Sequence, residues 1–170
     1  NSLHLSDVDI GYFNADMRLT PPLRQGADRD ALRTALADGT IDAIATDHAP
    51  HTSLEKDCEF SYAKPGMIGL ELCFGLLLGL VGKNGLTLGR LIDALSTRPA
   101  RIAGFDAPTL REGALAELVL IDPEAVWTPQ RGSLRSKSDN TPFWSAELHG
   151  RVLATIAGGH LVFDRVEATA

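Results

Sequence analysis

The stretch Ala45-Thr46-Asp47-His48-Ala49-Pro50-His51 decides the fold, because it joins a mostly apolar run to a cluster of ionisable side chains. The run from Ile41 to Ala45 is typical of a buried parallel strand. Pro50 has no amide hydrogen and cannot continue a paired strand, so the chain is expected to leave for a loop. The ionisable cluster is therefore expected at the carboxyl end of a strand, where α/β enzymes assemble their active sites.

The composition predicts a soluble cytoplasmic protein that binds neither nucleic acid nor a membrane. Its 170 residues, 44% of them hydrophobic, suit one domain with or without a small appendage. Acidic residues outnumber basic ones by 22 to 16, and the resulting net charge of −6 argues against a nucleic-acid surface. The longest apolar run, from Leu70 to Val81, is short and interrupted by glycine, so we expect no membrane span. We also expect no signal peptide and no secreted disulfide framework.

The first two thirds of the chain have the pattern of helices joined by loops. A helix is expected from Ala27 to Gly39, where Gly39 supplies a left-handed end. Residues 52–66 are polar and charged, and they are expected to form a long loop above the strand end. Thr97 is expected to cap the last of three further helices, at Ile68–Val81, Leu88–Ser96 and Pro99–Ala103.

The last third has the pattern of strands. Leu115–Ile121 and Arg151–Ala157 are rich in apolar and β-branched residues, which favours strands. Gly158-Gly159 predicts a tight hairpin into His160–Phe163, because glycine tolerates the positive φ that such turns need. The change from helices to strands falls between Phe105 and Glu112.

Several segments together resemble the dihydroorotases of the cyclic amidohydrolase superfamily. They occur in the order of that family, with roughly its spacing, and cover nearly the whole chain. The Asp-His-Ala-Pro-His form of residues 47–51 favours a dihydroorotase over an allantoinase or a hydantoinase. The segments are Thr20-Pro21-Pro22-Leu23-Arg24, Asp38 to His51, Glu55-Lys56, Gly66-Met67-Ile68-Gly69-Leu70-Glu71, Ser96 to Ile102, and Ser136-Lys137-Ser138-Asp139-Asn140-Thr141-Pro142-Phe143.

The resemblance implies an α/β fold, namely the carboxyl-terminal part of a TIM-barrel amidohydrolase followed by strands of a small β-sandwich domain. Residues 1–108 would supply the last strands and helices of the (β/α)8 barrel, and residues 109–170 the β-sandwich appendage. The implied reaction converts N-carbamoyl-L-aspartate to dihydroorotate and water in pyrimidine biosynthesis, with one or two zinc ions.

The resemblance also has consequences for partners. The His-x-His pair and the other metal ligands of the family would precede this chain, which has no His-x-His pair of its own. The chain is therefore expected to need the missing amino-terminal half and to be inactive alone. A homo-oligomer, and association with aspartate carbamoyltransferase, are further expectations.

Asp47 is the residue that the resemblance marks as both a metal ligand and the catalytic acid–base. A carboxylate beside a cation stays ionised, can take a proton from the attacking water, and can return it to the departing amide nitrogen. The residues alone leave an alternative, in which a strand-end aspartate caps the following turn through its side chain.

Substrate-binding roles are implied for His51, Thr20, Pro65 and Gly66. His51 would bind the substrate carboxylate through an imidazole N–H, and its alternative is a solvated loop histidine. The backbone at Thr20, Pro65 and Gly66 would lie against the substrate ring, which a Cβ at Gly66 would block. An ordinary loop turn is the alternative for Pro65-Gly66. His48 would face away from Asp47 and make structural hydrogen bonds instead.

Two other functions are open on the sequence. One is a non-catalytic dihydroorotase-like subunit that scaffolds aspartate carbamoyltransferase, although Asp47 and His51 are both present. The other is a hydrolase for a different cyclic amide, such as allantoin or a hydantoin. Catalytic and scaffold proteins differ in metal ligands that this chain does not contain.

Overall fold

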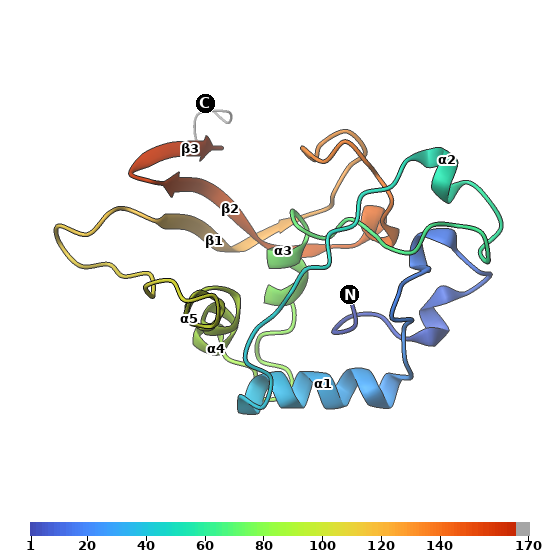
Figure 1. The fold of residues 1–170 in the computed structure, drawn as a ribbon, viewed down its shortest axis with the longest axis horizontal. Coiled ribbons are helices and arrows are strands. Elements are labelled where there is room, and N and C mark those ends of the chain that lie inside the picture. The colour runs from blue at the N-terminus through green and yellow to red at the C-terminus, as the bar shows by residue number, and fades with distance from the viewer. Residues whose placement is uncertain (166–170) are drawn as a thin grey trace.

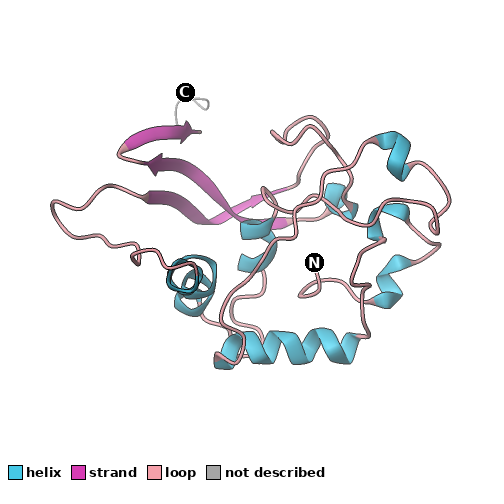
Figure 2. Ribbon diagram, in the orientation of Figure 1, coloured by secondary structure: helices cyan, strands magenta, loops and turns pink. Residues whose placement is uncertain are grey.

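The computed structural model describes residues 1–165 and shows a set of helices and loops beside a small antiparallel sheet (Figure 1, Figure 2). The architecture thus belongs to the α/β class. The helices are α1 (Gly26–Asp38), α2 (Ser53–Lys56), α3 (Cys73–Leu78), α4 (Leu88–Ile92) and α5 (Arg98–Ile102). The strands are β1 (Leu118–Trp127), β2 (Leu148–Ala157) and β3 (His160–Asp164). Among residues 1–165, no helix has the length and apolar character that crossing a bilayer requires.

The helix predicted at Ala27–Gly39 is confirmed as α1. The carboxylate of Asp28 accepts a hydrogen bond from the Gln25 backbone N–H at its start, at 3.2 Å. Gly39 follows the helix at φ 90°, a left-handed conformation that glycine adopts without a Cβ penalty. Leu36 is buried on the inner face, in an apolar cluster with α3 and α4.

The strand predicted at Ile41–Ala45 is wrong for this chain. The segment pairs with no other strand among residues 1–165, and Asp42 and Ala45 are exposed. Its backbone hydrogen bonds go to helices instead, because Ile41 N–H donates to Ala35 O at 2.9 Å and Ile44 N–H to Ala94 O at 3.0 Å. A strand is defined by a neighbour, and no neighbouring strand lies beside this segment in the part of the chain described.

The helix predicted at Ile68–Val81 is shorter than expected, because α3 begins only at Cys73. The backbone N–H groups of Gly69 and Leu70 both point at Nδ1 of His48, at 3.2 Å each, and this geometry holds the start of the segment outside the helix. The predicted helix end at Ser96 and the predicted cap at Thr97 are also wrong. A π-helical turn at Asp93–Thr97 connects α4 directly to α5, and Thr97 itself has helical dihedral angles without a capping hydrogen bond.

The three strands form one antiparallel sheet in the order β1-β2-β3. The hairpin predicted at Gly158-Gly159 is confirmed, since Ala157 pairs with His160 across it. β1 runs further than predicted, to Trp127, through a shift of register that contains Pro123, and β2 begins earlier, at Leu148. One sheet is present among residues 1–165, so the second layer of a β-sandwich stays a prediction.

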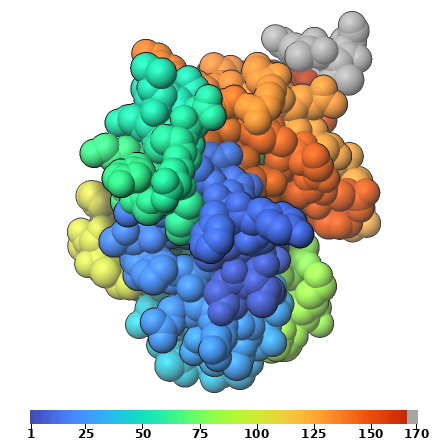
Figure 3. Space-filling view, turned by 90° about the vertical axis from the view of Figure 1, so that its right-hand side faces the viewer, coloured from blue at the N-terminus to red at the C-terminus, as the bar shows by residue number. Residues whose placement is uncertain are grey.

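Close packing between α3 and β2 joins the helical part to the sheet (Figure 1). A Cβ at Gly75 would lie 3.0 Å from Cβ of Leu148, and one at Gly150 would lie 2.2 Å from Cδ2 of Leu78. A second apolar cluster brings the amino-terminal segment, through Leu5 and Leu19, against Phe143. In the space-filling view this segment lies against both the loop of α2 and the chain that precedes β2 (Figure 3).

Candidate active site

All five predicted site residues lie on three segments that run side by side. Gly66 N–H donates to Arg18 O at 2.8 Å, which joins the Thr20 segment to the Pro65 segment. Ala49 N–H donates to Met67 O at 2.9 Å, and His48 and Met67 form a short parallel bridge. The structure thus brings together residues that are up to 46 positions apart in sequence, between Thr20 and Gly66.

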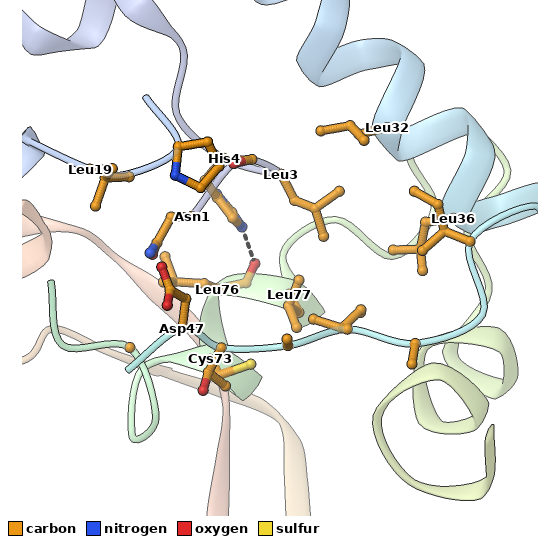
Figure 4. A pocket seen from close by; sticks show the side chains of 18 of the residues that line it. Asn1, Leu3, His4, Leu19, Leu32, Leu36, Asp47, Cys73, Leu76 and Leu77 are labelled. Carbon is orange, nitrogen blue, oxygen red and sulfur yellow. Dashed lines mark hydrogen bonds between the residues drawn. The ribbon is translucent and has the colours of Figure 1, made fainter. Parts of the chain in front are cut away.

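Asp47 stands at the edge of a cavity of about 490 Å³ (Figure 4). Its φ of 49° is left-handed, a conformation that aspartate tolerates better than most residues and that is enriched at functional sites. Its side chain is exposed and accepts no hydrogen bond from residues 1–165, so it does not cap the following turn. Thr20 lines the same cavity, as do several apolar side chains, including Leu19, Leu36, Ile44, Leu76 and Leu77.

One of the residues that line this cavity is a half-buried histidine, His4. Nε2 of His4 lies 2.8 Å from the carbonyl oxygen of Leu76 (Figure 4). The His4 ring also packs edge-on against Phe143. Burial lowers the pKa of His4 to about 4, and the carbonyl contact only partly offsets this.

His48 and His51 flank Ala49-Pro50 and do different things. His48 accepts two backbone N–H groups at Nδ1, as described above, which confirms its predicted structural role. Nε2 of His51 lies 3.0 Å from the carbonyl oxygen of Pro65, a contact in which the imidazole N–H donates. Nδ1 of His51 lies 3.7 Å from the Glu55 carboxylate, so both ring nitrogens face protein groups.

Gly66 is held where no other residue fits. Its φ is 134°, and a Cβ would lie 2.5 Å from Cβ of Ala49 and 3.2 Å from Nε2 of His51. The space beside Gly66, where the sequence predicts a substrate ring, is filled by Ala49 and His51. The lack of a side chain at Gly66 thus allows the two loops to meet.

Residues 52–66 are predicted to form a loop throughout, but they begin with the short helix α2, and Lys56 at the end of that helix anchors the segment. The Lys56 side chain is 7% exposed, and its ammonium group donates to Ala15 O at 2.9 Å and to Lys64 O at 2.8 Å. Burial lowers the pKa of Lys56, although the charge of Asp16 opposes this. The guanidinium of Arg18 also donates to Ala63 O. The loop is therefore anchored at several points beside His51.

The predicted site residues fall into two groups. Thr20 and Asp47 line the large cavity, whereas Pro65 and Gly66 do not. His51 lines a second, polar cavity of about 310 Å³, together with residues that include Asp16, Lys56, Arg131 and Asn140. The catalytic role of Asp47 and the substrate-binding roles of His51, Thr20, Pro65 and Gly66 stay predictions.

The donors needed for a zinc ion are not all present. Zinc in proteins takes three or four side-chain ligands from histidine, cysteine and carboxylates. No group of three or more such side chains that could hold a metal lies within residues 1–165. Asp47 fits as a single ligand, because its carboxylate is exposed and without a hydrogen bond from the described residues. These residues therefore do not form a complete zinc site by themselves.

Sequence reasoning missed one residue at this site, Asn140. It is 3% exposed and contacts both loops through its side-chain amide. Its segment was recognised as a family motif, but its partners lie 74 to 91 residues away, and local pattern does not reveal them.

Comparisons with known proteins agree with this picture. The profile of the amidohydrolase family matches residues 4–162. A dihydroorotase of Anaeromyxobacter dehalogenans is 47% identical over 168 residues, which cover 98% of this chain and 39% of that protein. A dihydroorotase of Geobacter metallireducens is 45% identical over 161 residues, which cover 95% of this chain and 38% of that protein.

The fold is also similar to that of solved amidohydrolase structures. The L-hydantoinase (dihydropyrimidinase) of Arthrobacter aurescens superposes with a TM-score of 0.87 at 25% identity, over 97% of this chain and 38% of that one. The chain thus spans less than half the length of the relatives that it matches. Its sequence is 45 to 47% identical to the two dihydroorotases above, and it belongs to the amidohydrolase family.

Proposed function

We propose that this chain works as the carboxyl-terminal portion of a zinc-dependent dihydroorotase. The observation that carries the proposal is the Asp47 carboxylate, which is exposed at the edge of the large cavity with no hydrogen bond from residues 1–165. A structural aspartate next to a loop normally bonds its own backbone. A carboxylate kept clear of such bonds is available for a ligand or a proton.

Within the proposed enzyme, Asp47 holds and moves a proton. Asp47 would contribute one ligand oxygen to a zinc ion, which when bound would supply electrostatic stabilisation of the charge that develops on the reacting amide. The Asp47 carboxylate takes the proton from the attacking water and returns it to the ring nitrogen as the amide opens. Ring closure of N-carbamoyl-L-aspartate follows the same path in reverse. Thr20, Pro65 and Gly66 orient the ring through their backbone, and His51 contacts the substrate carboxylate.

In the proposed enzyme, residues 1–108 are the last part of a TIM barrel, and the described residues 109–165 belong to a β-sandwich. Ile41–Ala45 has no paired strand among residues 1–165, and in the proposed enzyme the amino-terminal half would lie beside it. Exposed apolar side chains on the sheet support a further layer there, among them Val119, Leu120, Val126, Leu161 and Val162. The assembled enzyme is cytoplasmic and homo-oligomeric, with aspartate carbamoyltransferase as a candidate partner.

Dihydroorotate is proposed over other cyclic amides on the strength of the curated relatives. The named dihydroorotases reach 47% identity, whereas the L-hydantoinase reaches 25%. Dihydroorotate carries a carboxylate and hydantoin does not. The proposed contact of His51 therefore concerns dihydroorotate alone, whereas the proposed proton transfer by Asp47 would serve either substrate.

The experiment compares substrates in the full-length protein that contains this chain. The zinc-loaded protein is given dihydroorotate, hydantoin, allantoin and N-carbamoyl-L-aspartate, and ring opening and closure are followed by absorbance. We expect the highest kcat/KM for dihydroorotate in one direction and N-carbamoyl-L-aspartate in the other. A higher kcat/KM for hydantoin or allantoin would contradict the proposal that dihydroorotate is the substrate. No turnover of any of them, together with binding to aspartate carbamoyltransferase, would make the protein a scaffold.

A further inference from the structure

The segment Ser136–Phe143 lies outside both predicted substrate-binding loops, yet its residue Asn140 touches each of them. The side-chain Oδ1 of Asn140 accepts the His51 backbone N–H at 3.1 Å. Its Nδ2 donates to Ala49 O at 3.0 Å and to Gly66 O at 3.2 Å. Both amide hydrogens and one oxygen lone pair of this buried side chain are thus used.

The chemistry of the three partners requires an amide at this position. Two carbonyl oxygens face Nδ2 and one N–H faces Oδ1, so only one orientation of the amide satisfies all three. A carboxylate keeps the bond to His51 but sets an oxygen against the carbonyls of Ala49 and Gly66. An apolar side chain of similar size loses all three bonds and leaves buried polar groups without partners.

Neighbouring contacts hold Asn140 itself in place. Its own carbonyl oxygen accepts the Ile68 N–H at 3.0 Å. At the start of the segment, the Glu71 carboxylate accepts the backbone N–H groups of Arg135 and Ser136, at 2.9 Å and 2.8 Å. The indole N–H of Trp144 donates to Asp139 O at 2.9 Å. The segment is therefore fixed on both sides of Asn140, which makes that residue a rigid clamp.

The clamp acts on the geometry between the two loops. The Ala49–His51 loop and the Pro65–Gly66 loop also meet through the His51 imidazole and the Ala49 backbone N–H. Asn140 bonds one loop at two points and the other at one, so it sets their spacing and angle. Small displacements of substrate-binding groups have large effects on turnover.

We propose that Asn140 is a positioning residue for substrate binding, which acts by holding His51 and Gly66 in register through its side-chain amide. The proposal rests on the function proposed above, since it takes those loops to be the ones that contact the substrate. Asn140 does not touch the reacting atoms in this account. Its effect is transmitted through the backbone of the two loops.

The first measurement tests whether Asn140 holds the two loops, and it does not depend on enzyme activity. Amide hydrogen exchange at His51 and Ala49 is followed by NMR in the full-length protein that contains this chain. In Asn140→Leu we expect exchange at both amides to become at least tenfold faster. In Asn140→Asp we expect the His51 amide to stay protected, because its acceptor Oδ1 remains. We expect the Ala49 amide to exchange faster, because its N–H donates to Met67 O between the two loops, and the new carboxylate would push those loops apart. Unchanged exchange at both amides in Asn140→Leu would overturn the proposal.

The second measurement reads the effect on substrate in the full-length protein. We expect Asn140→Asp and Asn140→Leu to raise KM for dihydroorotate at least tenfold, and to lower kcat less than KM rises. The matched control is Thr141→Val, in the same buried segment, where Oγ1 accepts the Phe143 N–H at 3.4 Å and makes no hydrogen bond to either loop among residues 1–165. That variant is expected to lower the melting temperature but leave KM within twofold.

The outcomes separate this proposal from the function on which it rests. Faster exchange in Asn140→Leu with an unchanged KM would overturn the positioning role and leave Asn140 as a structural residue. Equal KM changes in Thr141→Val would also overturn it, because general destabilisation would then explain both. Faster exchange in a full-length protein whose parent form hydrolyses no cyclic amide would refute the proposed function instead.

Discussion

The imidazole of His51 and the carbonyl oxygen of Pro65 lie 3.0 Å apart, and this contact joins two loops that the sequence marks separately. Gly66 lies directly against the same ring, with room for no side chain. The second ring nitrogen faces Glu55 at 3.7 Å. A substrate carboxylate that binds His51 must therefore compete with one of these two groups, so the binding loops work as one unit.

Replacing Gly66 by alanine tests how tightly the loops are joined. The new Cβ would lie 2.5 Å from Cβ of Ala49, at a φ of 134° that L side chains rarely adopt. We expect Gly66→Ala to lower the free energy of unfolding by roughly 2 to 4 kcal/mol. Gly82→Ala is the control, because Gly82 also has a positive φ but faces open space, and it is expected to cost about 1 kcal/mol. Equal melting temperatures for the two variants would show that the close approach is unimportant.

Arg90 is expected to hold the chain that leads into Asp47. Its guanidinium donates to Leu36 O at 2.9 Å and to Ile41 O, and pairs with Asp93 at 3.3 Å. A lysine keeps the charge, but its single ammonium group cannot bond all of these groups at once as the planar guanidinium does. We expect Arg90→Lys to lower the free energy of unfolding by about 1 to 3 kcal/mol, measured by chemical denaturation. Arg101→Lys, at an exposed position of α5, should change it little, and a similar loss there would contradict the assignment.

His4 predicts a dependence of stability on pH. Its pKa in the folded chain is about 4, below the value of about 6.5 in an unfolded chain. As the pH falls from 6.5 toward 4, the unfolded state therefore takes up the proton first, and stability is lost over that window. The expected loss is on the order of 2 to 3 kcal/mol. Denaturation of His4→Gln across the same range should show a loss smaller by that amount.

The control for this measurement is His160→Gln, because His160 is exposed on β3. Its pH profile should match that of the parent chain. If His4→Gln and the parent lose stability equally between pH 6.5 and 4, the imidazole is not buried neutral in solution.

The 170-residue chain is expected to show no dihydroorotate hydrolysis by itself, even with added zinc. Asp47 is a single donor, and residues 1–165 hold no group of three metal ligands. The measurement is turnover at saturating substrate, with zinc content determined after dialysis. Hydrolysis at a rate near that of the full-length protein would refute the view that the site is incomplete.

The sequence correctly predicts those helix and hairpin ends that are determined by residues at the end itself. The left-handed Gly39 ends α1 where the sequence predicts, and Gly158-Gly159 forms the expected hairpin. Ile41–Ala45 shows the limit, because an apolar run predicts burial but does not supply the strands that must pair with it. The helix predicted from Ile68 starts later than expected for a related reason. His48, from a distant segment, accepts the backbone N–H groups of Gly69 and Leu70.

The same limit applies to the site. Asp47 could be singled out from its place between an apolar run and a proline, and the structure does put it at a cavity. The role of Asn140 depends on bonds to Ala49, His51 and Gly66, which only the folded chain brings within reach. The predicted reason for Gly66 also changed, because a protein contact fills the space that a ligand was expected to need.

The most direct test of the proposed function is the kcat/KM of Asp47→Asn for dihydroorotate in the full-length protein. Because the Asp47 side chain is exposed and accepts no hydrogen bond from residues 1–165, the zinc-free Asp47→Asn protein should melt at the same temperature as the zinc-free parent. Asp106→Asn, also exposed, serves as the control. We predict that Asp47→Asn lowers kcat/KM about a thousandfold while Asp106→Asn leaves it unchanged. An Asp47→Asn protein within tenfold of the parent would contradict the proposed catalytic role.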